Sequence, residues 1–239
     1  PPQEGLKRLM SVGGFPEPFL SGDERAARRW RRERFDGVLR EDIRDLESVR
    51  NIGLLGMFLN LLRERVGNLV TLSRLAQDLQ ISPKTALSWL EVLERMYLVF
   101  SVRPYTKSLP RAVLKPPKVY FFDTGDCLTG EGERFENLVA ASLLKRLHFL
   151  EDRDGFRYEL RYIRDKEGRE VDFVLEQGRD LVAVEVKMTT RPSFNDIKNL
   201  LAFLEEHPRA IRGVLVHAGS ALRHLHSKVI AVPWWWLGS

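Results

Sequence analysis

Cysteine is nearly absent from this sequence of 239 residues, in which Cys127 is the only one. A lone cysteine excludes a disulfide framework and a cysteine-based zinc site within the chain. No apolar run reaches the roughly 18 residues that a membrane helix needs, and no signal peptide is visible, so we expect a cytoplasmic protein. The pattern G-x-x-x-x-G-K-[ST] is also missing, which excludes a Walker loop for nucleotide phosphates.

The composition sets wide limits. With 44% apolar residues, the chain can bury one large or two modest cores. A net charge of +5 and a pI near 9.4 permit nucleic-acid binding without requiring it. The densest basic run, residues 25–40, is interleaved with acids on a predicted helix, and the pattern favours a solvated face over a track for phosphates. The first residue is Pro rather than Met, which fits a fragment of a longer protein.

Residues 169–187 predict a β-hairpin that brings two carboxylates together. If Gly178 and Arg179 form a two-residue turn, Gln177 pairs with Asp180, and the same register sets Asp172 opposite Glu185. On the face they share lie Asp172, Val174, Ala183, Glu185 and Lys187, and the other face carries Val171, Phe173, Leu175, Val182, Val184 and Val186. The alternation fixes the register, because a slip by one residue would move the charges into the core.

Two opposed carboxylates need a compensating cation, since their Cβ atoms would lie only about 4.5 to 5.5 Å apart. Lys187 is one candidate, and a divalent metal is the other. A hard cation such as Mg²⁺ accepts carboxylate oxygens and waters, and it can activate a water against a phosphate. The alternative is an exposed strand face on which Glu185 and Lys187 form a solvated ion pair.

The surrounding pattern predicts an α/β fold, α+β overall, with a mixed sheet. Residues 131–149 predict an amphipathic helix in which Glu136 lies on the flank of the buried side, either with a partner or reaching solvent. Residues 156–165 predict a strand before the hairpin, and residues 193–208 a helix capped by Ser193. A buried strand over 212–219 then implies a crossover with parallel pairing.

The helix glutamate, the V-D-F-V strand and the V-E-V-K strand, in this order, resemble the PD-(D/E)XK nuclease superfamily. This resemblance implies an αβββαβ restriction-endonuclease-like core with bound Mg²⁺ or Mn²⁺. It assigns metal binding and catalysis to Glu136, Asp172 and Glu185, and it gives Lys187 the role of assisting the attacking water.

A narrower resemblance covers nearly the whole chain. KVYFFDTG at 118–125, FENLVAASLLK at 135–145 and EVDFVLE at 170–176 are similar to the C-terminal region that follows the ATPase module in many prokaryotic AAA+ proteins. SVGGFPEPFL at 11–20 resembles the end of that ATPase module. The resemblance implies that an AAA+ ATPase module of the same longer chain is a partner.

Residues 71–105 predict a helix-turn-helix followed by the start of a wing. Ser82 caps and Pro83 opens the second helix, and Leu75, Leu87 and Leu90 belong to the predicted apolar stripes. In a winged helix, the start of this second helix would face DNA. The residues offered there are Lys84, Thr85 and Ser88. A module that only packs against protein is the alternative.

Histidines and tryptophans near the C-terminus invite functional interpretations. His217, His224 and His226 could ligate a metal, but the pattern favours ordinary surface histidines, the last two in a loop or helix end. The tryptophans of residues 233–239 could stack bases. The interpretation favoured by the sequence is that some finish the core and the others cover a self-association or domain surface.

The predicted organisation is a helical lead-in over 1–50, a winged-helix domain over 51–110 and a nuclease-like domain over 118–239. The predicted function is a metal-dependent DNA phosphodiesterase associated with an AAA+ ATPase. The alternative is an inactive nuclease fold and winged helix that bind DNA or protein for the ATPase, or that select its client. A homo-oligomer remains open.

Overall fold

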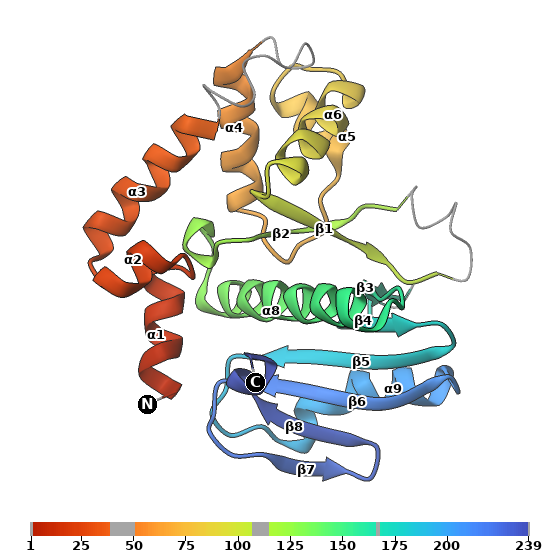
Figure 1. Ribbon diagram of the computed structural model, residues 1–239. Coiled ribbons are helices and arrows are strands. Elements are labelled where there is room, and N and C mark those ends of the chain that lie inside the picture. The colour runs from red at the N-terminus through yellow and green to blue at the C-terminus, as the bar shows by residue number, and fades with distance from the viewer. Residues whose placement is uncertain (1, 39–50, 107–114, 166–167, 239) are drawn as a thin grey trace. The chain divides into compact units, whose positions relative to one another are not determined.

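The computed structural model describes residues 2–38, 51–106, 115–165 and 168–238 (Figure 1). The chain divides into two compact units. The sheet unit comprises Pro1–Leu6, Val102–Lys115 and Leu138–Ser239, and the helical unit comprises Lys7–Ser101 and Pro116–Asn137. In the described ranges, no helix is both long enough and apolar enough to cross a membrane. The three predicted segments, 1–50, 51–110 and 118–239, stay a prediction.

Most of the helical unit is built from short capped helices. Asn51 accepts a hydrogen bond from the backbone N–H of Leu54, and Asp23 accepts one from Arg25, so each supplies the cap that a helix start requires. The elements that lie wholly or mostly in this unit are α1 (Pro2–Val12), α2 (Pro16–Ser21), α3 (Glu24–Gly37), α4 (Ile52–Arg63), α5 (Leu72–Asp78), α6 (Pro83–Arg95), β2 (Lys118–Phe121) and the short helix η2 (Thr124–Asp126).

Helices α5 and α6 form the predicted helix pair. The Ser82 side chain accepts a hydrogen bond from the Thr85 N–H, which confirms the predicted cap. One predicted core residue was wrong: Leu87 is 41% exposed, whereas Trp89 is 2% exposed and its ring lies 5.9 Å from that of Phe58. The large side chain of Trp89 determines which side of α6 faces the core. A prediction based on the leucine positions alone does not identify that side.

The described strands form one mixed sheet, which confirms the predicted α/β fold. Its order is β2-β1-β3-β4-β5-β6-β8-β7. The strands introduced here are β1 (Val99–Pro104), β3 (Glu159–Arg164), β4 (Glu170–Gln177), β5 (Asp180–Lys187), β6 (Ala210–His217), β7 (Arg223–His226) and β8 (Val229–Pro233). The accompanying helices are α8 (Glu131–Asp154), η3 (Phe194–Ile197), α9 (Lys198–Glu206) and η4 (Trp234–Gly238). Helix α8 therefore begins where predicted and extends beyond the predicted end.

The hairpin of β4 and β5 has the predicted register. Gln177 pairs with Asp180, and the ladder continues to Phe173 and Val184. Gly178 adopts a φ of +56°, which a residue without a Cβ tolerates in a tight turn. The paired residues stop one step short of Asp172 and Glu185, because the side chain of Asp172 takes the N–H of Val186 instead.

Both faces of this hairpin are covered, which corrects the simple division into an apolar and a charged face. Phe173 is 0% exposed on one face, and Val174 and Ala183 are 0% exposed on the face that was expected to carry the charges. Val174 and Ala183 belong to a core cluster to which α9 contributes Leu200, among others. Helix α9 connects β5 to β6, which pair in parallel as predicted.

Candidate functional site

The carboxyl ends of β5, β6 and β8 meet at one edge of the sheet. Lys187 pairs with His217, and His217 pairs with Pro233, so the last residues of the three parallel strands lie in one row. Figure 1 shows the arrowheads of these strands on the same side. In open α/β sheets, ligands bind preferentially outside the carboxyl ends of strands. We call this row and the segments that leave it the carboxyl edge.

Asp172 lies on β4, next to the final residues of β5. Its Oδ2 atom accepts a hydrogen bond from the backbone N–H of Val186 at 2.8 Å. Asp172 is therefore held against β5 by a backbone contact, which keeps its carboxylate close to the next residues of that strand. A bond of this kind stabilises the ionised form of a carboxylate.

Glu185 and Lys187 form an ion pair on β5. The Glu185 residue is 3% exposed, and its Oε1 atom lies 2.8 Å from the Nζ atom of Lys187, whose side chain is 42% exposed. Burial opposes the charge of Lys187, but the ion pair and hydrogen bond with Glu185, together with Asp172 and Asp196, raise its pKa. Lys187 is consequently an ammonium ion at neutral pH, which can donate hydrogen bonds but cannot accept a proton.

Glu136 lies in the helical unit, where it binds two buried side chains. Its Oε1 atom accepts hydrogen bonds from Lys118 Nζ at 3.1 Å and from the Tyr120 hydroxyl at 2.5 Å. Lys118 is 1% exposed and Tyr120 is 0% exposed. The sequence left open whether Glu136 has a partner or reaches solvent. The structure gives it partners in the KVYF stretch of β2, a stretch that the resemblance included without linking it to Glu136. Its metal role stays a prediction.

The side chains near Lys187 supply only some of the ligands that a metal ion needs. Across the described ranges, no three His, Cys, Asp or Glu side chains are grouped so as to hold a metal ion. Asp172 and Glu185 lie on the adjacent strands β4 and β5. Two carboxylates with waters are enough for Mg²⁺, which usually keeps several of its own waters. The arrangement could thus provide two metal-binding oxygens beside an ammonium ion.

One of the three C-terminal histidines was wrongly expected at the surface. His217 is 0% exposed, its Nδ1 atom accepts a hydrogen bond from the Gly219 N–H at 3.0 Å, and burial lowers its pKa. A neutral imidazole therefore lies next to Lys187 in the strand row. The available signal was its place in an apolar strand, GVLVHAG. His224 and His226 are exposed as expected, but on strand β7 rather than in a loop or helix end.

The predicted DNA-contacting residues lie in the first two turns of α6. Lys84 is exposed, and Thr85 and Ser88 are half-buried. The Thr85 hydroxyl lies 2.8 Å from the Ser82 hydroxyl, so part of its hydrogen-bonding capacity serves the helix cap. The structure thus groups these residues, and their contact with DNA stays a prediction.

Family models match almost the entire chain. A domain of unknown function, DUF8612, matches residues 3–129. The chain belongs to the DUF8612 family. A second domain of unknown function, DUF4143, matches residues 131–237 and is commonly found alongside AAA+ ATPases.

Curated relatives are uncharacterised proteins. One from Methanocaldococcus jannaschii is 26% identical over 204 residues, which cover 81% of this chain and 44% of that protein. One from Mycobacterium tuberculosis is 24% identical over 250 residues, covering 95% of this chain and 52% of that protein. This DUF8612 chain spans about half the length of these relatives.

One solved structure shows a weak likeness. It is a half-complex from a tetradecameric assembly of Thermococcus gammatolerans McrB AAA+ hexamers with bound McrC. The matched chain is 13% identical with a TM-score of 0.33, over 95% of this chain and 46% of that chain. Such a likeness is too low to assign a fold or a partner.

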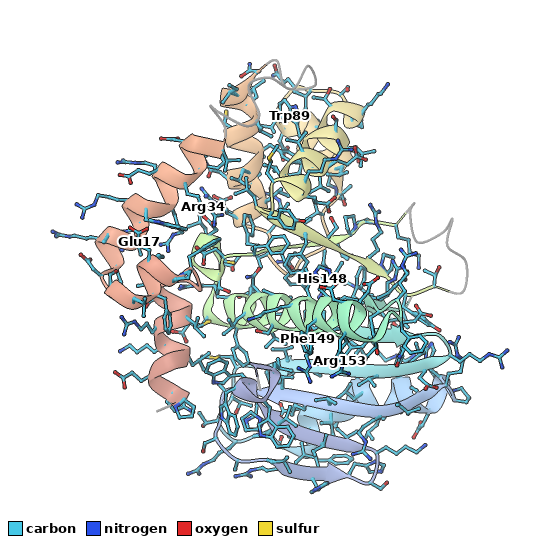
Figure 2. All side chains as sticks on the ribbon, viewed as in Figure 1. Glu17, Arg34, Trp89, His148, Phe149 and Arg153 are labelled. Carbon is cyan, nitrogen blue, oxygen red and sulfur yellow. The ribbon has the colours of Figure 1, made fainter. Side chains whose placement is uncertain are left out.

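Within the DUF8612 match lies a second group of charged residues that sequence reasoning missed. Asp123 is 0% exposed and its Oδ1 atom accepts hydrogen bonds from the N–H groups of Gly14 and Gly125. Asp126 binds Arg63 at 2.8 Å and Arg34, labelled in Figure 2, at 3.5 Å. These contacts join the GGF and FFDTG stretches. The resemblance had singled out both stretches without assigning them a structural role.

Proposed function

We propose that this chain is a metal-dependent phosphodiesterase that acts on DNA and works with an AAA+ ATPase. The observation that carries the proposal is the meeting of Asp172, Glu185 and Lys187 at the carboxyl edge of a mixed sheet. Two carboxylates and a cation suit phosphate chemistry, since the reaction must hold a water and neutralise phosphoryl oxygens. The match to a domain commonly found alongside AAA+ ATPases supports the proposed partner.

Asp172 and Glu185 would hold a Mg²⁺ or Mn²⁺ ion. When bound, such an ion lowers the pKa of its water and offsets charge on the phosphate. Asp172 is already oriented by the Val186 N–H, so little ordering is required of it. Glu185 is buried, which strengthens its attraction for any cation that replaces or joins Lys187.

Lys187 would act as a hydrogen-bond donor rather than as a base. Its raised pKa keeps it protonated, so its ammonium group can orient the attacking water or bind a phosphoryl oxygen. Its side chain is 42% exposed and can turn from Glu185 toward substrate without crossing the core. This assignment narrows the role implied by the resemblance, in which the lysine assists the attacking water.

The second candidate function is a binding module without turnover. The observation that favours it is the Glu185–Lys187 ion pair, which gives the Oε1 atom of the buried carboxylate a cationic partner without any metal. In that case the nuclease-like sheet would serve as a docking platform, and Lys84, Thr85 and Ser88 would contribute DNA contacts.

Cleavage of labelled single-stranded, duplex and forked DNA with Mg²⁺ or Mn²⁺ separates the two functions. We expect cutting that is lost in Asp172→Asn, Glu185→Gln and Lys187→Met but kept in Asp180→Asn, an exposed carboxylate at the other end of β5. Glu136→Gln in the same series tests the metal role that the resemblance gives it. ATP-dependent cleavage by a longer relative would support the ATPase link.

Metal-dependent thermal stabilisation gives a readout that does not need turnover. A ligand present at 100 times its Kd stabilises the folded state by about 2.7 kcal/mol. This gain should disappear in Asp172→Asn and persist in Asp180→Asn. Equal inertness of wild type and variants in cleavage, with no stabilisation by either metal, would leave only the binding module.

A further inference from the structure

Exposed apolar side chains gather on the segments that leave the carboxyl edge. Each of the strands β5, β6 and β8 is followed by at least one of them. They are Met188 (42% exposed), Phe194 (54%), Leu222 (38%), Trp235 (36%) and Trp236 (47%). Contiguous exposed apolar groups mark a binding surface more often than isolated ones do, and Trp235 and Trp236 are such neighbours.

The two exposed tryptophans stand close to the proposed catalytic row. They follow Pro233 after Trp234, and Pro233 is two strands from Lys187 in the same row. Neighbouring strands are about 4.8 Å apart, so roughly 10 Å separates the backbone at Lys187 from the start of the tryptophan run. The ring centroids of Trp235 and Trp236 are 6.5 Å apart and their planes are inclined by 58°. Each indole therefore has its own orientation and can take its own stacking partner.

The end of the chain has a charge that suits phosphate. From His207 to Ser239 the sequence contains no Asp or Glu and four basic residues, Arg209, Arg212, Arg223 and Lys228. Arg223 and Lys228 are exposed, on β7 and in the turn that follows it. Arg223 pairs with Ala231 near the carboxyl end of β8, and Lys228 lies in the turn at the other end of β8, so Arg223 is the basic side chain nearer to the tryptophans.

We infer that Trp235 and Trp236 stack unpaired bases of a single-stranded nucleic acid whose backbone contacts the β7–β8 hairpin. The inference rests on the proposed function and deepens it, because it makes an unpaired strand the substrate class. Indole rings stack on any base, and only unpaired bases offer an accessible face. Duplex would offer phosphates to Arg223 and Lys228 but no base face to the tryptophans.

The binding experiment uses the 239-residue chain in EDTA, so that neither metal nor cleavage contributes. Fluorescently labelled oligo(dT), oligo(U) and a duplex of the same length are the probes, and quenching of tryptophan fluorescence is a second readout. We expect tighter binding of the single strands. The oligo(dT) and oligo(U) arms distinguish DNA from RNA as the source of the strand.

Variants assign the binding to the tryptophans. Trp235→Ala and Trp236→Ala should each weaken oligo(dT) binding by about fivefold or more, the order expected for one base stacked on one ring. Trp235→Phe should retain most of it, which separates stacking from a folding defect. Phe156→Ala is the matched control, since Phe156 is 61% exposed and precedes β3, whose Glu159 pairs with Glu176 at the opposite edge.

The salt dependence tests the backbone contact. Arg223→Ala should reduce the slope of log affinity against log salt by about 0.7, as expected for one lost phosphate contact with a single strand. Asp180→Asn, an exposed carboxylate at the other end of β5, should leave binding in EDTA intact. The inference is overturned if single strands bind no better than duplex, or if the tryptophan variants bind like wild type. It is also overturned if these variants only shift the chain from dimer to monomer in sedimentation.

The two proposals fail in different ways. Tryptophan-dependent binding of single strands without any metal-dependent cleavage would reject the phosphodiesterase and keep the base-stacking surface. Cleavage that depends on Glu185 but is equal for wild type and the Trp235→Ala and Trp236→Ala variants on single strands would reject the surface and keep the enzyme.

Discussion

Replacing Glu136 by glutamine distinguishes a structural from a metal-binding role. Glu136→Gln preserves the size of the side chain and one oxygen that can accept a hydrogen bond from the Tyr120 hydroxyl. It removes the negative charge that faces Lys118, whose ammonium group is 3.1 Å away. If this pair supports the helical unit, the variant must lose stability even when no metal is present.

The magnitude follows from the burial of the pair. The side chains of Lys118 and Glu136 are 2% and 16% exposed, so solvent screens their attraction poorly. Removing one partner of a buried ion pair costs about 3–5 kcal/mol, and the residual exposure of Glu136 favours the lower end, about 3 kcal/mol. At about 2–4 °C per kcal/mol for a chain of this size, Tm should fall by roughly 6–12 °C.

Thermal unfolding followed by circular dichroism in EDTA measures this loss. The control Asp152→Asn removes an exposed carboxylate from the same helix, α8, and should melt within about 2 °C of wild type. The double variant Glu136→Gln with Lys118→Met should lose less than the two single losses added together, because the buried charge is then gone as well. The reasoning is refuted if Glu136→Gln melts like wild type in EDTA while losing stabilisation by Mg²⁺.

Four further predictions concern single substitutions away from the carboxyl edge. Gly13→Ala should destabilise the chain by more than about 2 kcal/mol in chemical unfolding, because Gly13 has a φ of +87° and an added Cβ would lie 2.0 Å from the Asp123 carboxylate. Gly5→Ala in α1, with nothing within 4 Å of an added Cβ, should stabilise by about 0.5–1 kcal/mol. Burial, followed by the charge of Asp126, raises the pKa of Asp123. The folded state therefore loses stability as pH rises above the ordinary pKa of an aspartate and through the raised pKa of Asp123. Asp123→Asn cannot ionise, and its Tm relative to wild type should therefore rise with pH across the acidic range. Finally, Lys84→Ala should weaken duplex DNA binding and lower its salt slope by about 0.9 if α6 faces DNA, and an unchanged slope would remove Lys84 from the contact.

The sequence was sufficient to predict the local features that depend on a strong pattern. The alternation of side chains along the two strands, together with the turn at Gly178, predicted the pairing of β4 with β5. This pairing runs from Gln177 and Asp180 to Phe173 and Val184. The serine and proline at positions 82 and 83 gave the start of α6, because a capping hydroxyl and a fixed φ act within a single turn. The parallel pairing of β5 and β6 followed from chain order alone.

Features that depend on partners distant in sequence could not be predicted. The apolar strand GVLVHAG was a signal that His217 is buried, but no pattern showed that His224 lies exposed on a strand, since that depends on which neighbours cover it. Leu87 was misplaced because the larger Trp89 occupies the core side of α6. The partners of Glu136 are two residues of β2, and no periodicity links a helix residue to a particular lysine on another element.

The end of the β4–β5 ladder explains how two carboxylates can lie on neighbouring strands. A directly opposed pair would be destabilised by repulsion between like charges. Here the backbone pairs end at Phe173 and Val184, and Asp172 bonds to the Val186 N–H instead of facing Glu185 across a regular ladder. Glu185 in turn binds Lys187 on its own strand. Each carboxylate therefore has its own compensating donor, and the pair can persist without a metal. A metal cation must compete with Lys187 for Glu185. Raising the metal concentration should therefore release the Lys187 ammonium group, which can then bind substrate.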